Sequence, residues 1–140
     1  MSFWRCYYHV VWATKNRQPL LTPEIERVII EVATEKSQSL ACPIQAMNGA
    51  GDHLHTAVCI PPHMAVAEWV RNIKGISTHT INDRFPDLEV RFQWQRGYGV
   101  LTFGAKVLPV VSDYITRQKE HHQLSTTDAY LEQMDENLAG

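Results

Sequence analysis

Two histidines separated by one residue form the feature of this sequence whose chemistry is easiest to interpret. His53 and His55 lie in the apolar run GDHLHTAVCI. Side chains at alternate positions of a β-strand point to the same side, so both imidazoles would face one way. Such a pair can supply half of a metal site. Alone it is more often a packed or surface feature, so it needs corroboration elsewhere in the chain.

The corroborating residues lie in the segment 107–122, which is expected to form one helix docked on a sheet. Tyr114 and Gln118 are four residues apart, so on a helix they would share one side. A tyrosine hydroxyl is a poor nucleophile at its ordinary pKa near 10, but a divalent cation beside it can polarise a phosphodiester and favour the phenolate. His53, His55 and Gln118 could hold that cation. Imidazole ligands by themselves would favour Zn²⁺ or Fe²⁺.

The elements that must position these residues follow from the hydrophobic pattern and from the turn residues. Strands are expected at residues 3–14, 43–47, 54–60, 90–94 and 99–103, and helices at 22–40, 64–85 and 107–122. Thr22 before Pro23 is a typical helix start. The order βαββαβ with a terminal helix predicts an α+β fold of the ferredoxin-like or RRM-like type. Its antiparallel sheet would carry two helices on one face, and the tyrosine-bearing helix would follow at the C-terminus.

Length and composition predict one domain over residues 1–125 and an acidic tail over residues 126–140. The chain has 140 residues, of which 44% are hydrophobic, which is enough for a single core. Its net charge of −2 argues mildly against a polyanionic partner. However, the tail contributes four acidic residues without a lysine or arginine, namely Asp128, Glu132, Asp135 and Glu136. Residues 1–127 therefore carry 13 basic and 11 acidic side chains, and the body is weakly basic.

The basic residues of the body could line a groove for a nucleic-acid strand, although dispersed lysines and arginines are also typical of a solvated surface. The candidates for such a groove are Lys15, Arg17, Arg71, Lys74, Arg84, Arg91 and Arg96.

The cysteines and the apolar segments indicate the compartment. The chain has an odd number of cysteines, Cys6, Cys42 and Cys59, and they lack CxxC spacing. This favours reduced thiols in the core over disulfides or a zinc site. No apolar stretch approaches the roughly 20 residues that span a bilayer. A cytoplasmic protein without a membrane segment is expected.

Several motifs together resemble a known family. The histidine pair on a strand, the block 94–99 (WQRGYG) and the helix 114–118 (YITRQ), which is followed by Glu120, His121 and His122, are similar to IS200/IS605-type single-tyrosine transposases. These enzymes belong to the HUH endonuclease superfamily. The resemblance covers about residues 6–122, including the segment 11–15 (VWATK), so the acidic tail lies outside it.

The resemblance implies a homodimeric DNA transposase that binds hairpins of single-stranded DNA and cleaves and rejoins the strands. It implies Mg²⁺ or Mn²⁺ as the cofactor, with His53, His55 and Gln118 as metal ligands. Tyr114 would attack the scissile phosphate and form a 5′-phosphotyrosine intermediate. The candidate DNA contacts are Lys15, Arg17, Arg71, Lys74 and Arg96. The resemblance also implies that the tyrosine helix can complete the partner subunit's site, for which residues 104–106 are a candidate hinge.

Other functions stay open at this point. One alternative is a non-catalytic or domesticated hairpin-binding protein of the same fold, which would bind DNA without cleaving it. Another is a metal-dependent hydrolase of small substrates, in which Tyr114 would be dispensable. His121 and His122 could contact phosphate or simply cap the C-terminal end of the helix.

Overall fold

A four-stranded antiparallel sheet forms the centre of the molecule, with strand order β2-β3-β1-β4. The structure is a computed structural model and describes residues 2–124 and 131–132. The strands are β1 (Tyr7–Ala13), β2 (Ile44–Gly49), β3 (His53–Cys59) and β4 (Gly99–Phe103). The helices are α1 (Pro23–Ser39), α2 (Val66–Arg84), α3 (Leu108–Thr116) and α4 (Gln118–Leu124), and η1 (Lys15–Arg17) and η2 (Ala105–Val107) are short 3-10 turns. The α+β fold predicted from the sequence is confirmed.

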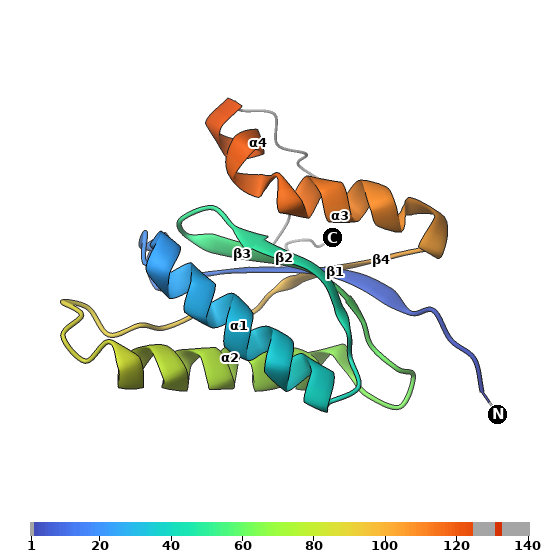
Figure 1. The fold of residues 1–140 in the computed structure, drawn as a ribbon, viewed down its shortest axis with the longest axis horizontal. Helices are drawn as coiled ribbons and strands as arrows, with labels where there is room; N and C mark the ends of the chain where they lie inside the picture. The colour runs from blue at the N-terminus through green and yellow to red at the C-terminus, as the bar shows by residue number, and fades with distance from the viewer. Residues whose placement is uncertain (1, 125–130, 133–140) are drawn as a thin grey trace.

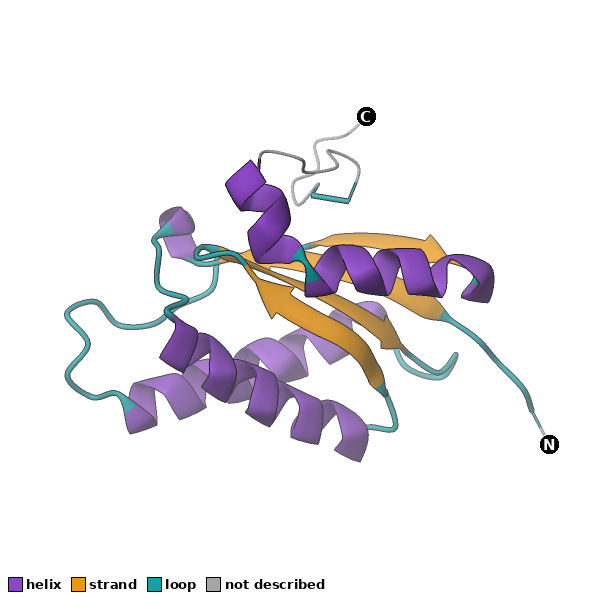
Figure 2. Ribbon diagram, turned by 45° about the horizontal axis from the view of Figure 1, so that its top comes forward, coloured by secondary structure: helices purple, strands orange, loops and turns teal. Residues whose placement is uncertain are grey.

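The helices lie on both faces of the sheet. Helices α1 and α2 cover one face, and α3 and α4 lie over the other (Figure 1). Figure 2 shows the same three layers from a second direction. No described helix is long and apolar enough to cross a membrane.

The two long helices begin and end where the sequence predicts. The Thr22 side chain accepts a hydrogen bond from the backbone N–H of Ile25, with Pro23 in the first turn of α1. This cap satisfies one of the free N–H groups at the helix start. Gly75 does not interrupt α2, which runs through it to Arg84.

The main core lies between the sheet and the pair α1/α2. Its largest fully buried side chains include Trp12 from β1, Trp69 from α2 and Phe92. The Trp69 indole N–H donates to Ser37 Oγ at 2.9 Å, so its polar atom is satisfied inside the core. Cys42 is buried there as well, whereas Cys6 and Cys59, which were also expected in the core, are only partly buried.

The packing between the sheet and α3 is much thinner. It consists of Ala57, Val111 and Ile115, with Ala46 and Phe103 partly buried beside them. Fully burying one such aliphatic side chain is worth about 1.5–3 kcal/mol, so this layer holds α3 far less firmly than the main core holds α1 and α2.

The expected strand at residues 90–94 does not form, and this prediction was wrong. Only a single bridge joins Trp94 to Thr14. The side chain of Asn82 in α2 takes both backbone groups of Phe92: its Nδ2 donates to the carbonyl at 3.1 Å, and its Oδ1 accepts from the N–H at 3.0 Å. These groups are therefore not available for a neighbouring strand. The first strand is also shorter than predicted, since it begins at Tyr7 rather than at Phe3.

The single helix expected over residues 107–122 is broken at Arg117, so this prediction was also wrong in detail. Helix α3 ends at Thr116 and α4 begins at Gln118. The Asn48 side chain donates to the Thr116 carbonyl at 2.9 Å, and Lys119 Nζ contacts both Asn48 Oδ1 at 2.7 Å and Glu26 Oε2 at 2.6 Å. These contacts from β2 and α1 hold α4 in a direction different from that of α3.

Candidate active site

His53 and His55 project from β3 toward α3, on the face opposite the main core. Their strand pairs with β1 so that His53 lies opposite Ala13 and His55 opposite Val11. The alternation predicted for β3 is confirmed, because Leu54 enters the main core and Ala57 enters the thin layer under α3. Both imidazoles are almost fully buried, and their ring centroids are 5.1 Å apart.

His53 is oriented by a carboxylate directly before it in the chain. Its Nδ1 lies 2.7 Å from Asp52 Oδ1, and Asp52 in turn accepts hydrogen bonds from the Arg17 guanidinium at 3.3 and 3.4 Å. A proton on Nδ1 leaves the Nε2 lone pair free to bind a metal, which is the usual arrangement of metal-binding histidines. Arg17, predicted as a DNA contact, thus also supports the histidine site.

His55 is oriented by a third histidine, His9 of β1. His9 Nε2 lies 2.8 Å from His55 Nδ1, and the two rings stack with centroids 5.0 Å apart. Burial, helped by the charge of His55, lowers the pKa of His9 to about 3, so His9 is neutral. A neutral His9 can accept the Nδ1 proton of His55, and in that tautomer His55 Nε2 is available as a ligand.

Tyr114 and Gln118 reach the same place from the two C-terminal helices. The Tyr114 side chain comes from α3, and its ring centroid lies 6.1 Å from that of His55. Gln118 begins α4, is fully buried, and has its Oε1 3.3 Å from His53 Nε2. The structure therefore brings together all four residues predicted for catalysis and metal binding.

Two residues join this group that the sequence had not indicated as ligands. His122 Nε2 lies 3.0 Å from His53 Nε2, so His122 faces the site rather than merely capping a helix. Glu132 belongs to the predicted acidic tail, yet its carboxylate contacts His53, His55, His122, Tyr114 and Gln118. Asp128, Asp135 and Glu136, the other acidic residues of the tail, lie outside the described residues.

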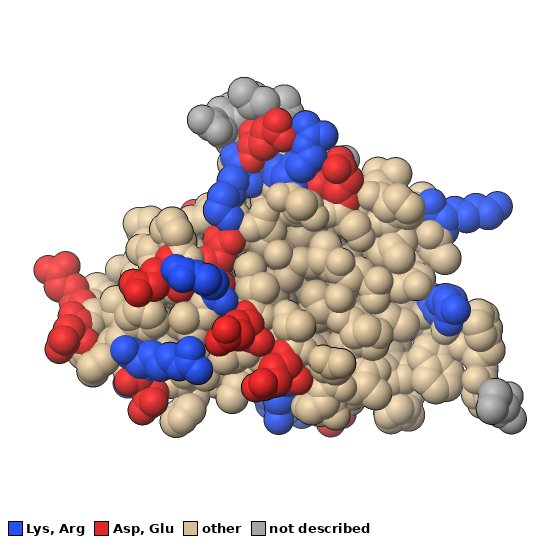
Figure 3. Space-filling view, viewed as in Figure 1, with Lys and Arg blue, Asp and Glu red and all other residues tan. Residues whose placement is uncertain are grey.

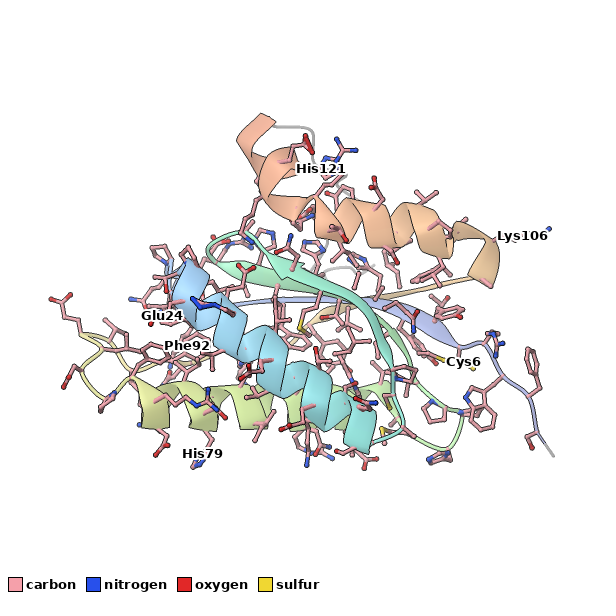
Figure 4. The ribbon with its side chains drawn as sticks, in the orientation of Figure 1. Cys6, Glu24, His79, Phe92, Lys106 and His121 are labelled. Carbon is pink, nitrogen blue, oxygen red and sulfur yellow. The ribbon has the colours of Figure 1, made fainter. Side chains whose placement is uncertain are left out.

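His121 supports the tyrosine rather than the histidines. Its ring stacks on Tyr114 with a centroid separation of 4.5 Å and an interplanar angle of 22°. In Figure 4 His121 projects from α4 above the sheet, at the other end of the C-terminal helical segment from Lys106.

The ionisation of the site follows from burial and from these hydrogen bonds. Burial lowers the pKa of His55 below its ordinary value, and its contacts with Glu132 offset this only in part. For His53 the hydrogen bonds to Glu132 and Asp52 outweigh burial and raise the pKa. Burial would raise the pKa of Glu132, but the hydrogen bonds from His53, His55 and Tyr114 hold it far below the usual range, so this carboxyl is ionised.

The donor set fits a divalent cation. One ligand atom from each of His53, His55, His122 and Glu132 can be chosen so that all lie within 4.8 Å of one another. Asp52 and His9 each fix one imidazole with Nε2 turned inward, and Gln118 adds an amide oxygen. Metal binding requires that both Nε2 atoms be unprotonated, and a proton held on each Nδ1 leaves the Nε2 lone pair for the cation.

A groove of about 720 Å³ lies between α2 and the segment 91–96, and basic side chains line it. Its lining residues include Lys15, Lys74, Arg91 and Arg96, together with Trp94. Lys74 Nζ donates to the carbonyls of Gln95 and Gly97 at 2.8 Å each, so it also fixes the segment beside the groove.

The predicted DNA contacts fall into one group and two outliers. Lys15, Lys74 and Arg96 share the groove. Arg17 lines a neighbouring cavity of about 230 Å³ that has Arg96 in common with the groove. Arg71 lies in another cavity, of about 330 Å³, which also contains Lys36. On the face shown in Figure 3, lysines and arginines alternate with acidic residues, so the surface in view carries no continuous basic patch.

The sequence offered a signal for some of the supporting residues that were missed. Asp52 directly precedes the histidine pair. His9 lies on the neighbouring strand β1, where side chains alternate between the two faces of the sheet, and it falls on the face that carries the site. Glu132 gave no such signal, because a separation of 77 residues from His55 leaves no periodicity to detect.

Comparison with known proteins identifies the family. The family described as "Transposase IS200 like" matches residues 2–118. The chain is 30% identical over 125 residues to the transposase for insertion sequence element IS200 of Salmonella typhimurium (strain LT2), which covers 86% of this chain and 82% of that protein. It is 22% identical over 117 residues to the ISDra2 transposase TnpA of Deinococcus radiodurans, covering 81% of this chain and 84% of the relative.

Solved structures show the same fold at lower identity. A Deinococcus radiodurans protein assigned as a transposase superposes with a TM-score of 0.69 at 23% identity, covering 84% of this chain and 93% of the other. A REP-associated tyrosine transposase bound to a REP hairpin superposes with a TM-score of 0.62 at 19% identity, covering 87% and 74%. The family match spans the histidine pair, Tyr114 and Gln118, and the fold agrees with it. This chain therefore belongs to the IS200-like transposase family.

Proposed function

We propose that this transposase cleaves and rejoins single-stranded DNA at hairpin-containing ends through a covalent bond to Tyr114. One observation supports this most directly: among the described tyrosines, Tyr114 is the one whose ring lies against the ring of His55. Its hydroxyl also shares the Glu132 carboxylate with the Gln118 amide. A tyrosine nucleophile explains how strands could be cut and rejoined without another energy source, because the covalent bond keeps the energy of the phosphodiester.

In the proposed cleavage step the Tyr114 oxygen attacks the scissile phosphorus. The new bond joins this oxygen to phosphorus, the bond from phosphorus to the 3′ oxygen breaks, and the 3′ oxygen takes up a proton. Tyr114 loses its own proton to water. The products are a 5′-phosphotyrosine and a free 3′-OH, and the reverse reaction with another 3′-OH rejoins DNA.

His53, His55 and Gln118 are the residues that would hold the cation, which we propose to be Mg²⁺ or Mn²⁺. When bound, such a cation supplies charge that polarises the phosphodiester. Asp52 and His9 keep the two imidazoles turned inward, and the buried site excludes bulk water from them.

The basic groove is the proposed binding place of the DNA hairpin. Lys15 lines the groove and lies two residues beyond Ala13, which pairs with His53. The proposed path of the DNA strand runs from the groove past Lys15 and around the end of β1 to the site. The hairpin seen in the REP-associated relative is bound by that protein, and its shared fold supports a hairpin partner here.

A homodimer is the proposed assembly. Val100 in the edge strand β4 and Val107 and Val110 in the segment that follows are exposed apolar side chains that a second copy could cover. In this chain α3 packs on its own sheet, which supports a site that Tyr114 completes within the same subunit. A cytoplasmic location is proposed along with this function.

The test is a covalent trap with a matched variant. The wild-type protein, incubated with Mn²⁺ and labelled single-stranded hairpin DNA, is expected to give a protein–DNA band that resists denaturation. Tyr114→Phe should abolish the band but keep hairpin binding, whereas Tyr98→Phe, which changes a tyrosine away from the histidines, should retain it.

The alternatives give different results. Hairpin binding without any adduct from the wild-type protein would indicate a non-catalytic hairpin-binding protein. An adduct that persists in Tyr114→Phe would show that another residue is the nucleophile.

A further inference from the structure

The carboxylate of Glu132 occupies the centre of the candidate site. Its Oε1 lies 3.2 Å from His53 Nε2, 3.1 Å from His55 Nε2 and 3.3 Å from His122 Nε2. Its Oε2 accepts hydrogen bonds from the Tyr114 hydroxyl at 2.5 Å and from the Gln118 amide at 3.1 Å. Only 14% of the Glu132 side chain is exposed. Its carboxylate contacts the proposed nucleophile and all three proposed metal ligands.

This arrangement has a simple electrostatic consequence. Imidazole lone pairs and an ionised oxygen repel one another unless a proton or a cation lies between them. When His55 donates its Nδ1 proton to His9, its Nε2 is unprotonated and faces the carboxylate directly. A shared cation therefore turns an unfavourable contact into a ligand set.

Glu132 also resolves a mismatch in the ligand chemistry. Two imidazoles and one amide oxygen form a set that softer metals suit better than Mg²⁺ or Mn²⁺ do. A carboxylate is the ligand type that these harder cations prefer, and Oε1 is the acidic oxygen that the described residues place among the histidines.

The same carboxylate resembles the reacting phosphodiester in its single negative charge and in offering two oxygen atoms. A scissile phosphate must present one oxygen to the histidine ligands while its phosphorus lies next to the tyrosine hydroxyl. Glu132 already presents one oxygen to the histidines and the other to Tyr114. Two anions cannot share this volume, so Glu132 and the phosphate exclude each other.

Building on the function proposed above, we propose that Glu132 completes the divalent-cation site of the DNA-free protein and that the scissile phosphate displaces it. Removing the Glu132 side chain should then weaken the binding of the cation when DNA is absent. With the cation at saturating concentration it should strengthen the binding of single-stranded DNA, because the competing anion is gone.

The experiment compares the full-length wild-type protein with Glu132→Ala and with Glu136→Ala, which removes an equal charge from the same C-terminal segment. Calorimetric titration with Mn²⁺ alone should show an affinity at least about tenfold lower for Glu132→Ala and unchanged for Glu136→Ala. Hairpin DNA with a single-stranded flank across the cleavage position, titrated at saturating Mn²⁺, should bind Glu132→Ala more tightly than wild type.

Each other outcome overturns the proposal. Equal Mn²⁺ affinity of wild type and Glu132→Ala shows that Glu132 is not a ligand, and leaves the tyrosine mechanism to be judged by the adduct. An equal loss in Glu136→Ala assigns the effect to net charge. Weaker DNA binding by Glu132→Ala means that the carboxylate does not compete with phosphate. A wild-type protein that binds no Mn²⁺ refutes both this proposal and the proposed metal dependence.

Discussion

Each of the two central histidines depends on a partner placed behind it. Asp52 accepts the Nδ1 proton of His53, and His9 can accept that of His55. Such outer partners fix both the tautomer and the direction of the ligand atom, and their loss commonly lowers metal affinity by about 10- to 100-fold. His9 is thus a positioning residue, since it lies behind His55 and acts through it.

Replacing His9 tests this role. His9→Leu leaves the His55 Nδ1–H without an acceptor inside the protein, so we expect Mn²⁺ affinity to fall by about 10- to 100-fold in calorimetric titration. His9→Gln keeps an acceptor at similar size and should recover much of the affinity. If both variants bind Mn²⁺ as tightly as wild type does, His9 does not position His55.

At this scale the sequence predicted what is local and missed what is distant. His53 and His55 are two residues apart, and Tyr114 and Gln118 are four apart, so the ordinary geometry of a strand and a helix places each pair. His9 depends on the register between β1 and β3, and Glu132 depends on the path of the C-terminal segment. Neither is a property of a short stretch of sequence.

At the scale of the elements, the two errors of prediction share one cause. Apolar spacing predicted a strand at 90–94 and an unbroken helix at 107–122. Asparagine side chains from other elements take the backbone groups of Phe92 and Thr116 that these elements would have used. Both sets of hydrogen bonds join different elements, 10 residues apart for Asn82 and Phe92 and 68 apart for Asn48 and Thr116, so hydrophobic periodicity does not reveal them.

Two glycines give a matched test of how tightly β2 and β3 hold the site. A Cβ at Gly49 would lie 2.8 Å from the carbonyl oxygen of His53, whereas a Cβ at Gly75 in α2 would meet nothing within 4 Å. We expect Gly49→Ala to lower the free energy of unfolding by about 1–3 kcal/mol and to weaken Mn²⁺ binding. Gly75→Ala should raise the free energy of unfolding by about 0.5–1 kcal/mol.

Urea unfolding of the two variants and of wild type measures both effects. A Gly49→Ala protein as stable as wild type would mean that the strand shifts without strain, and the expected effect on His53 would then be absent.

At the scale of the whole molecule, positive charge is concentrated at one groove rather than spread over the surface. The net charge is −2, and basic and acidic groups alternate on the face shown in Figure 3. The groove between α2 and the segment 91–96 is the place where described basic side chains gather around a cavity of useful size. Recognition of DNA should therefore depend strongly on a few residues there.

Lys74 gives this groove a pH dependence of defined sign. Burial lowers the pKa of Lys74 to about 8, so the groove loses one positive charge between pH 7 and pH 9. Phosphate binding favours the protonated lysine, and hairpin affinity measured without divalent cation should fall as pH rises, by up to about tenfold at about 0.1 M salt. The Lys74→Met variant should lack this fall.

Lys106→Met serves as the control, because it removes one lysine that does not line the groove. A pH profile of Lys74→Met that matches wild type would assign the fall to another group.

The thin packing under α3 has a mechanical consequence for the proposed reaction. Val111 and Ile115 are the aliphatic side chains by which α3 packs on the sheet, and Tyr114 is the third buried side chain of this helix. Exposing the two aliphatic side chains costs about 3–6 kcal/mol and leaves the Trp12 and Trp69 core intact. After cleavage the severed DNA end would be tethered to this helix. Helix α3 could then move this covalently bound DNA end from the 3′-OH that it left to another 3′-OH while the rest of the protein stays folded.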